Sequence, residues 1–439
     1  MINRFIREWE YLPIAKEDFG DAASVTRAQA DRLISVARSA SDHIGLGGED
    51  AGRVLTDGRN RLRAGQVVGL IATRDVTLEI LPKIDGNDAG RTRENLVRML
   101  SKTLDLPIAG GALTNLGVQR YDLLEIIIRL FCDRLFEAVH RGLPRRYIGC
   151  EDDLPVLRGR LDLVRQFTIH AGKPQRLACR YEEPSPDIPL NQIMKSAVSR
   201  LRGIARAPGN QRRLFELELA FAEVGAVSSS HLPWDRVVLD RTNRAWADLL
   251  KLAKLLLGDR FQTTSSGRDA GFSLLFEMNT LFEEFVGRTL RATLLRNGAR
   301  VSLQRMKGHA LKDSDGKGRF ATMPDIVVET PGHDDWIIDT KWKRLKGSID
   351  DPKHGVAQAD VYQMMAYSQV YRCKRLMLLY PHHNEIRKEP GRIAEFNITG
   401  TDDSQLVVAT LDLSDISTVP EQLRRLLGHE LEWASLRVA

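Results

Sequence analysis

An aspartate and a lysine stand two residues apart inside an apolar segment of the C-terminal third of the chain. Residues 336–342 read WIIDTKW and place Asp339 and Lys341 among isoleucine and tryptophan side chains. Side chains at positions i and i+2 of a β-strand point to the same face of the sheet. If this segment is a strand, the carboxylate and the ammonium group share one face, with Ile338 and Thr340 on the other.

The spacing of aspartate and lysine decides nothing without its surroundings, because the sequence contains three such D-x-K triplets. The other two lie in polar segments marked by glycine or proline: Asp315-Gly316-Lys317 and Asp351-Pro352-Lys353. Charged side chains are ordinary in such turns. Only the triplet at Asp339 has apolar residues on both sides, and it therefore predicts charges placed inside a sheet.

The segment before it carries a further aspartate in the dipeptide Pro324-Asp325. Residues 321–329 are expected to pair antiparallel with residues 336–342 through the loop TPGHDD, which brings Asp325 to the edge where Asp339 lies. Two neighbouring buried carboxylates are costly unless a cation joins them. Carboxylate oxygens are hard ligands that suit Mg²⁺. The pattern therefore predicts a magnesium site.

A lysine beside such a metal site completes the groups needed for phosphodiester hydrolysis. The protonated Lys341 is no metal ligand, but it can stabilise negative charge on a phosphate or help to orient the attacking water. The alternative interpretation is structural. In that case Asp339 and Lys341 form a local ion pair on an edge strand, and Asp325 is a residue that starts a strand after proline.

The segments around these residues are expected to follow the order α-β-β-β-α-β, which is typical of one compact α/β domain. The expected elements are a helix at 272–295, strands at 301–306, 321–329 and 336–342, a helix at 356–371 and a strand at 375–380. A polar loop is expected at 307–318. Two more strands, at 394–398 and 405–413, and a helix at 420–431 are expected to complete the domain.

The motif PD…DTK at residues 324–341 resembles the signature of the PD-(D/E)XK nuclease superfamily, whose core has the same α-β-β-β-α-β order. The resemblance implies that the first helix supplies a glutamate to the site. The candidates are Glu283 and Glu284, of which Glu283 is preferred. The implied metal ligands are then Asp325, Asp339 and Glu283, around one or two Mg²⁺ ions.

The same resemblance implies that the helix after the lysine strand supplies polar side chains. In DVYQMMAYSQ these are Gln363 and Tyr367, which lie one turn apart on the same side of a helix. Glutamates and glutamines are common on helix surfaces. A purely surface role is therefore the alternative for Glu283, Gln363 and Tyr367.

The whole chain is expected to be an α+β protein of several domains, because 439 residues are too many for one ordinary core. Residues 1–91 are expected to form a β-rich domain with a helix at 24–38 and strands at 66–72 and 76–81. Residues 92–262 are expected to be mostly helical, and residues 263–439 to hold the restriction-endonuclease-like α/β domain. A dense basic run at residues 140–180 fits either a phosphate-contacting face or a solvated surface with local ion pairs.

Composition points to a cytoplasmic protein with no membrane association. Hydrophobic residues make up 43% and charged residues 28% of the chain, and no apolar run is long enough to span a bilayer. The first 20 residues are mixed and charged, unlike a signal peptide. The sequence also lacks a G-x-x-x-x-G-K-[ST] phosphate loop, so the chain itself is not expected to bind a nucleotide.

Several segments, spread over most of the chain and in the same order, resemble the McrC family, the nuclease subunits of McrBC-type modification-dependent restriction systems. Besides the DTK triplet they are IREWEYLPI, LEILPKI, RGLPRRYIGCEDDLPVLRGRLDL, SPDIPLNQI, FEMNTLFEEFV and DVYQMMAY. The resemblance implies a C-terminal nuclease domain and an N-terminal part that docks on a hexameric ring of an McrB-like AAA+ GTPase and stimulates its GTP hydrolysis. The implied substrate is double-stranded DNA carrying modified cytosine, which the partner recognises.

Three functions therefore stay open at the level of sequence. The first is a Mg²⁺-dependent endonuclease subunit of a GTP-driven restriction complex. The second is an assembly and GTPase-activating subunit that does not cut. The third is a stand-alone PD-(D/E)XK nuclease that acts in repair or on RNA.

Overall fold

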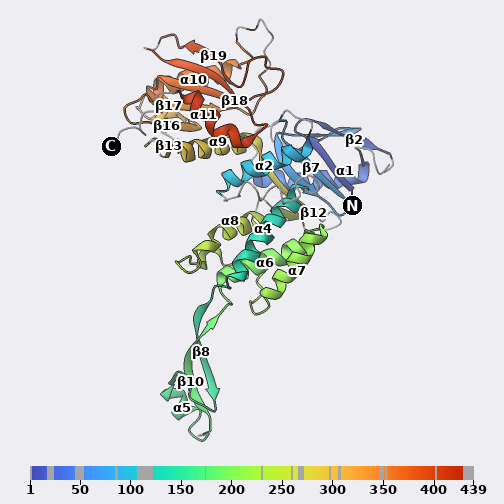
Figure 1. Cartoon of the computed structure of the whole chain (residues 1–439), viewed down its shortest axis with the longest axis vertical. Coiled ribbons are helices and arrows are strands. Elements are labelled where there is room, and N and C mark those ends of the chain that lie inside the picture. The colour runs from blue at the N-terminus through green and yellow to red at the C-terminus, as the bar shows by residue number, and fades with distance from the viewer. Residues whose placement is uncertain are drawn as a thin grey trace. The chain divides into compact units, whose positions relative to one another are not determined.

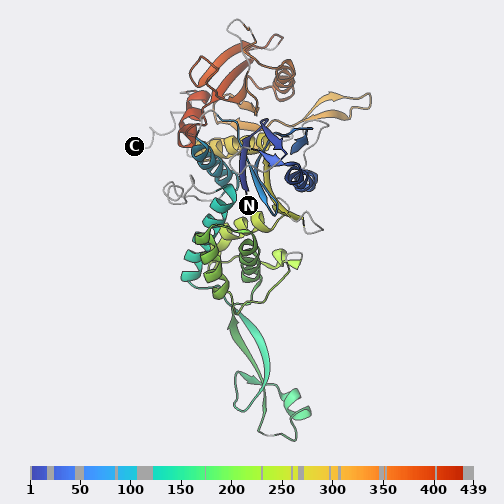
Figure 2. The ribbon, with the colours of Figure 1, turned by 90° about the vertical axis from the view of Figure 1, so that its right-hand side faces the viewer.

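The computed structural model shows a mixed α/β protein with several separate sheets (Figures 1 and 2). It describes residues 2–16, 24–44, 54–84, 88–105, 122–173, 175–228, 231–258, 261–264, 271–295, 298–304, 308–345, 351, 353–400 and 403–428. The chain divides into two compact units: residues 1–123 with 260–439, and residues 124–259. The finer expected boundaries, at residues 91 and 262, stay a prediction.

The first unit contains a five-stranded sheet that joins the N-terminal region to a strand from much later in the chain. Its order is β1-β7-β6-β12-β11. The strands are β1 (Ile2–Arg7), β6 (Val67–Ala72), β7 (Val76–Leu81), β11 (Phe261–Thr264) and β12 (Gly271–Glu277). The predicted hairpin of β6 and β7 is confirmed, with Thr73 Oγ1 holding the turn by contacts to Asp75 and Val76.

A smaller four-stranded sheet and a helix cover one side of this region. The strands are β2 (Tyr11–Ala15), β3 (Val25–Thr26), β4 (Leu55–Asp57) and β5 (Arg61–Ala64), in the order β3-β2-β5-β4. Helix α1 (Arg27–Ile44) buries an apolar side that includes Leu33, Val36 and Ala37. These residues share a core with Leu62 and Leu78 from the two sheets. Helix α2 (Ala89–Thr103) begins at an Asp88 N-cap.

The first unit also contains the six-stranded C-terminal sheet, in the order β13-β16-β17-β18-β20-β19. Its strands are β13 (Arg300–Leu303), β16 (Ile326–Glu329), β17 (Trp336–Thr340), β18 (Arg375–Pro381), β19 (Gly391–Asn397) and β20 (Gln405–Leu411). Strand β17 pairs antiparallel with β16 and parallel with β18, so it lies inside the sheet. The helices of this region are α9 (Met278–Leu294), α10 (Gln358–Tyr371), a short 3-10 turn (Ile416–Thr418) and α11 (Val419–Leu427).

Two of these helices contact opposite faces of β17. Met364 and Tyr367 of α10 share a core with Ile337, which lies on the same strand face as Asp339. On the other face, Phe282 of α9 packs edge-on against Trp342, with ring centroids 5.3 Å apart. The strand is therefore buried on both sides, as its apolar flanks predicted.

Three expectations for this region were wrong. The helix expected at 272–295 begins only at Met278, because FSLLF forms strand β12; a continuous apolar run of this length fits either element. The polar loop expected at 307–318 contains strand β14 (Gly308–Lys312), which forms a ribbon with β15 (Gly318–Thr322). The strand expected at 321–329 is thus divided between β15 and β16. The end of the helix expected at 420–431 lies outside the described residues.

The second unit combines packed helices with a long antiparallel ribbon that leads away from them (Figure 1). The helices are α4 (Leu123–His140), which begins at the unit's boundary, α6 (Pro189–Ile204), α7 (Pro208–Ala220) and α8 (Ala247–Leu257), with 3-10 turns at Trp234–Arg236 and Arg244–Trp246. The ribbon is formed by β8 (Arg146–Leu154) and β10 (Leu177–Ser185), with β9 (Arg160–Leu161) and α5 (Leu163–Thr168) near its end.

A mostly helical middle region was therefore only partly right. Most of β8 is at least partly exposed and carries charged residues on both faces, so it lacks the alternation of apolar and polar residues that identifies a strand. The basic run at 140–180 lies largely on this ribbon, where Arg158, Arg165 and Arg180 form ion pairs with nearby carboxylates. Among the described helices, none combines the length and apolar content that crossing a bilayer requires.

Candidate functional site

Asp339 lies at the end of β17 and is completely buried. Beyond it, the Lys341 amide donates to the Leu379 carbonyl at 2.9 Å, which extends the pairing with β18 past the last strand residue. The register pairs Ile326 with Ile338, and continuing it by one residue sets Asp325 opposite Asp339. The structure therefore brings the two predicted aspartates to neighbouring strand ends.

Asp325 is fixed in place by the strand that carries Asp339. Its Oδ2 accepts hydrogen bonds from the Thr340 amide at 2.8 Å and from Thr340 Oγ1 at 3.0 Å. The residue follows Pro324, whose ring cannot donate to a ladder, at the start of β16. Thr340, the middle residue of the D-x-K triplet, thus positions one carboxylate while its neighbours supply the other charges.

Lys341 connects the aspartates to α10. Its Nζ lies 2.5 Å from Asp339 Oδ2 and 3.2 Å from Gln363 Oε1. Gln363 Nε2 is 2.8 Å from the Tyr367 hydroxyl, which donates to the Met323 carbonyl at 3.1 Å. The two residues predicted on the helix after the lysine strand therefore join the site as a hydrogen-bonded chain behind the lysine.

Glu283 on α9 also faces this group, whereas Glu284 does not join it. Burial raises the pKa of Glu283 to about 7, and the charge of nearby Asp325 adds to this rise. Its Oε1 is buried and has no hydrogen-bond partner among the described residues. Glu284 instead pairs with Arg288 on its own helix, with 2.6 Å between Oε2 and Nε. Of the two sequence candidates, the structure places Glu283 toward the aspartates.

Burial makes the charged forms of the two aspartates less stable than they would be in water. Burial raises the pKa of Asp339 to about 6, repulsion from Asp325 contributes to the rise, and Lys341 opposes it. Burial likewise raises the pKa of Asp325. Burial disfavours the charged form of Lys341, but attraction to the surrounding carboxylates outweighs this effect and raises its pKa. The carboxyl groups of Asp325, Asp339 and Glu283 thus lie near one another, and a further cation among them would favour the ionised form of all three.

The carboxylate oxygens of Asp339 and Glu283 that lack a hydrogen-bond partner among the described residues are suitable ligands for a hard metal ion. Asp339 Oδ2 contacts only the Lys341 ammonium, and its buried Oδ1 has no hydrogen-bond partner among the described residues. In the described part of the chain no three histidine, cysteine or acidic side chains already form a metal-binding cluster. Mg²⁺ commonly takes only one or two protein carboxylates and keeps several waters. Asp325 and Asp339, with Glu283 beside them, match that requirement.

The sequence did not reveal the contribution of Gln304. Its amide donates to the Asp325 carbonyl at 2.9 Å, and its side chain hydrogen-bonds Glu283 and lowers the pKa of that carboxyl. Gln304 has φ 47°, a left-handed conformation that is uncommon for residues other than glycine. It lies just after β13 and within the range of the strand expected at 301–306, where nothing in the sequence marked it as a site residue.

The strand end is also held from the N-terminal sheet of the same unit. Trp342 Nε1 donates to Glu8 at 2.9 Å to Oε2, and the Lys83 amide donates to the same oxygen at 3.1 Å. Gln66 Nε2 donates to the Trp342 carbonyl at 2.9 Å. Glu8 has no exposed surface, and burial raises its pKa to about 8. The residue next to the catalytic lysine candidate is therefore fixed by a buried carboxyl group.

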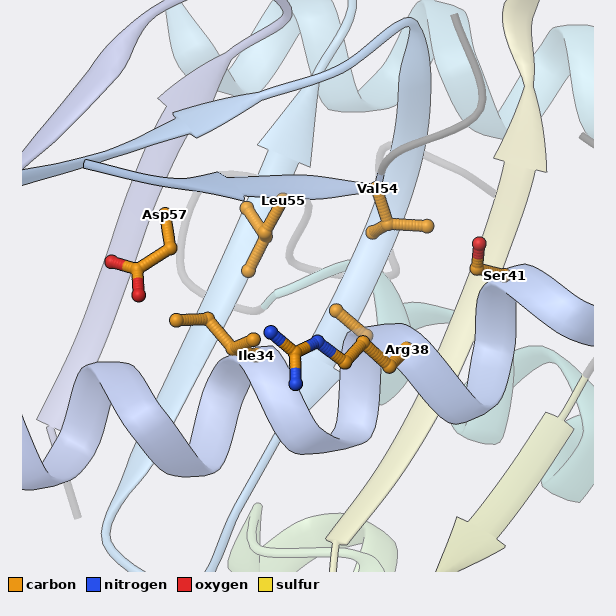
Figure 3. Close-up of a pocket in the computed structure, with 7 residues that line it drawn as sticks. Ile34, Arg38, Ser41, Val54, Leu55 and Asp57 are labelled. Atoms are coloured by element: carbon orange, nitrogen blue, oxygen red, sulfur yellow. The ribbon is translucent and has the colours of Figure 1, made fainter. Parts of the chain in front are cut away.

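A hollow of about 260 Å³ lies between α1 and β4 in the N-terminal region (Figure 3). Ile34, Val54 and Leu55 line it with apolar atoms, and the Arg38 side chain lies between them. None of the predicted site residues lines this hollow.

Comparisons with known proteins agree with this architecture. A family model described as "McrBC 5-methylcytosine restriction system component" matches residues 62–381. The fold is similar to a chain in the refined half-complex from a tetradecameric assembly of Thermococcus gammatolerans McrB AAA+ hexamers with bound McrC. That match has a TM-score of 0.76 and 22% identity, and covers 97% of this chain and 99% of that one.

A second similar chain occurs in the cryo-EM structure of the Thermococcus gammatolerans McrBC complex. It is 25% identical with a TM-score of 0.55, and the match covers 66% of this chain and 88% of that one. No curated protein matches the sequence.

Proposed function

We propose that this chain, which belongs to the family of McrBC 5-methylcytosine restriction system components, cuts DNA as the McrC-type nuclease subunit of a modification-dependent restriction complex. The observation that carries the proposal is the group at the end of β17. There Asp325, Asp339, Glu283 and Lys341 meet in a buried setting, with carboxylate oxygens that no protein donor satisfies.

The arrangement of elements supports a PD-(D/E)XK type of nuclease domain within residues 263–439. In chain order α9, β13, β16, β17, α10 and β18 follow the expected α-β-β-β-α-β, with the β14–β15 ribbon inserted after β13. The sheet places the Pro324-Asp325 dipeptide beside the Asp339-Thr340-Lys341 triplet.

In the proposed reaction the chain's own residues align the attacking water with the scissile phosphate. One or two Mg²⁺ ions held by Asp325, Asp339 and Glu283 would polarise the scissile phosphate and make water more acidic. Lys341 would place its positive charge beside the phosphate oxygens as negative charge develops during attack. Gln363, fixed by Tyr367, keeps the lysine from turning away. Attack by water forms a new P–O bond while the P–O bond to the leaving group breaks.

We further propose that the chain works with a partner. The T. gammatolerans structure similar to it over nearly its full length contains McrB AAA+ hexamers with bound McrC. A corresponding McrB-like GTPase hexamer would dock on the N-terminal region, residues 1–91, and this chain would stimulate its GTP hydrolysis. The substrate would be cytoplasmic double-stranded DNA that carries modified cytosine. The sequence lacks a phosphate-binding loop of its own, which fits this division of labour.

Variants of the site test the proposal directly. Lys341→Ala and Asp339→Ala, each assembled with the partner, methylated DNA, GTP and Mg²⁺, are expected to lower the cleavage rate by at least about 100-fold, the scale on which lost electrostatic stabilisation acts. Stimulation of the partner's GTP hydrolysis should be unchanged. Lys353→Ala, in a D-x-K triplet outside the site, is the matched control.

The outcomes separate the competing functions. Normal cleavage by both site variants would show that the site assignment is wrong. A wild-type complex that stimulates GTP hydrolysis without cutting any DNA would indicate a non-cleaving assembly subunit. Full cutting by this chain without partner or GTP would indicate a stand-alone nuclease.

A further inference from the structure

The β14–β15 ribbon stands out because almost none of it is buried. From His309 to Ala321 every side chain is exposed except that of Asp313. Leu311 is 58% exposed and Phe320 73% exposed, so the ribbon has no apolar layer beneath its arms. In Figure 2 it is the orange hairpin that extends away from the C-terminal sheet. A two-stranded ribbon is only marginally stable in isolation, and exposed apolar groups contribute nothing to its stability.

The base of the ribbon, in contrast, is tied to the candidate active site. The Tyr371 hydroxyl donates to the Thr322 carbonyl at 2.7 Å and lies 2.8 Å from Thr322 Oγ1. The next residue, Met323, accepts the hydrogen bond from Tyr367 through its carbonyl. Asp325 follows two residues later. A ligand that lies along the ribbon arms is therefore guided to the carboxylates at the ribbon's base.

The charges on the arms favour an anionic ligand. Asp313 is engaged within the turn, since it accepts hydrogen bonds from the Lys317 amide at 2.8 Å and from Arg319 Nε at 2.9 Å. The Lys312 and Lys317 ammonium groups form no ion pair with any described residue, and Asp315 at the tip is the remaining acidic side chain of the arms. Two unpaired ammonium groups on exposed arms suit contacts to backbone phosphates.

Phe320 adds an exposed aromatic ring, which a surface that binds anions by charge alone does not need. It has φ 57°, and this left-handed conformation is a genuine outlier for a bulky side chain. The register pairs on either side are His309 with Ala321 and Leu311 with Arg319, and the Phe320 side chain itself is 73% exposed. The strained backbone therefore holds an aromatic ring in solvent. Rings presented in this way stack on bases or insert between base steps.

From these observations we infer that the β14–β15 ribbon is a DNA-binding element that lies in a groove of the duplex beside the bond to be cut. A two-stranded ribbon has the width that the major groove of B-DNA admits. Lys312 and Lys317 contact phosphates, and Phe320 contacts an unstacked base step. The inference rests on the proposed nuclease function, because it takes duplex DNA as the ligand of the neighbouring site.

The lysines are tested by binding that does not depend on cleavage. The full chain carrying Asp339→Ala, which is expected not to cut DNA, is titrated with a duplex at several salt concentrations. Adding Lys312→Ala and Lys317→Ala should weaken binding about tenfold or more at low salt and reduce the slope of log K against log salt by about two. The control in the same background is Lys353→Ala, an exposed lysine that belongs to neither strand of the ribbon, which should change neither quantity.

Phe320 is tested with a duplex that carries 2-aminopurine at positions near the cut. Binding of the Asp339→Ala chain should raise the probe's fluorescence at one step, and adding Phe320→Ala should abolish that rise. The control is Phe396→Ala, a partly exposed phenylalanine on β19, which is an edge strand of the six-stranded C-terminal sheet and not part of the ribbon. Because Phe320 is exposed, its truncation should leave the thermal unfolding midpoint unchanged or raised.

The results distinguish this inference from the function it rests on. If the wild-type complex cuts DNA while the lysine variants bind with unchanged affinity and salt slope, the ribbon is not a DNA-binding element and the nuclease assignment stands. If the wild-type chain neither binds nor cuts duplex DNA, both are wrong. Normal binding with no fluorescence change in any protein would overturn the role given to Phe320.

Discussion

At the scale of single residues, Thr340 is the least conspicuous member of the site and one of the most constrained. Its amide and its hydroxyl both donate to Asp325 Oδ2, so one threonine fixes the orientation of a metal-ligand candidate. Groups that orient a metal ligand commonly change metal affinity by about 10- to 100-fold when they are removed. A small change at Thr340 should therefore alter the affinity for Mg²⁺ rather than the position of Lys341.

Thr340→Val removes the hydroxyl and keeps the shape of the side chain. We expect the Mg²⁺ concentration that gives half-maximal cleavage to rise about tenfold, because Asp325 keeps only the amide hydrogen bond. Thr340→Ser restores the hydroxyl and should restore the wild-type requirement. An unchanged Mg²⁺ requirement in Thr340→Val would show that Asp325 needs no such support or binds no metal.

Tyr367→Phe tests the hydrogen-bonded chain behind Lys341. The change removes the hydroxyl that binds both Gln363 and the Met323 carbonyl. We expect a fall of about tenfold in the maximal cleavage rate with little change in DNA affinity, because the lysine is positioned less well. Tyr362→Phe, an exposed tyrosine on the same helix, is the control. Equal rates for the two variants would contradict the role of Tyr367.

Much of the site could be predicted from the sequence because a strand has a fixed period. The apolar flanks of Asp339 indicated burial, and the i, i+2 rule placed Lys341 beside it. The choice between Glu283 and Glu284 depended on the rotation of α9 about its axis, which only packing determines. Gln304 could not be found at all, since its contacts to Asp325 and Glu283 join elements through tertiary structure.

At the scale of elements, the end of β17 depends on the N-terminal sheet. Glu8 is buried beneath Trp342 and accepts hydrogen bonds from its indole and from the Lys83 amide. Burial raises the pKa of Glu8 in the folded chain to about 8, from its ordinary value of 4.5. Between these values the folded state binds more protons than the unfolded state. Stability from this group is therefore full at low pH and is lost as the pH rises through this window.

Glu8→Gln should remove this dependence, because the amide is neutral at every pH. We expect the free energy of unfolding of the wild type, relative to that of the variant, to fall by up to about 1.4 kcal/mol per pH unit between pH 5 and 8. Urea unfolding at several pH values measures the difference. Parallel pH profiles for the two proteins would show that Glu8 is already ionised in the folded chain.

Elements marked by a turn or by a helical spacing were predicted well, and those without such a mark were not. Strands β6 and β7 are buried along their whole length, and the turn at Thr73-Arg74-Asp75 together with Pro82 marked their ends. Helix α10 buries Asp360, Met364, Tyr367 and Ser368, which recur at the spacing of a helix. The run FSLLF at residues 272–276 has no such spacing, and it became strand β12 because β6 offers it an edge. The exposed ribbon β14–β15 shows no buried face, so no apolar pattern could identify it.

At the scale of the whole molecule, sequence proximity does not define the compact units. Residues 1–123 and 260–439 form one unit, in which β12 pairs with β6 and Gln66 and Glu8 hold the segment after Lys341. A reading of composition along the chain cannot detect such a unit, because its two parts are far apart in the sequence. The arrangement means that the proposed docking region and the proposed nuclease site share hydrogen bonds within one folded body.

The proposed reaction requires the carboxylates at the end of β17 to hydrolyse DNA with Mg²⁺. The measurement that tests this is the single-turnover rate at which the assembled complex cleaves methylated duplex DNA, determined at several Mg²⁺ concentrations. It compares the wild type with Asp339→Asn and with Asp351→Asn. We predict a saturable Mg²⁺ dependence for the wild type and for Asp351→Asn, and a rate lower by about 1,000-fold for Asp339→Asn. Cleavage by Asp339→Asn at the wild-type rate and Mg²⁺ dependence would show that these carboxylates do not carry out the hydrolysis.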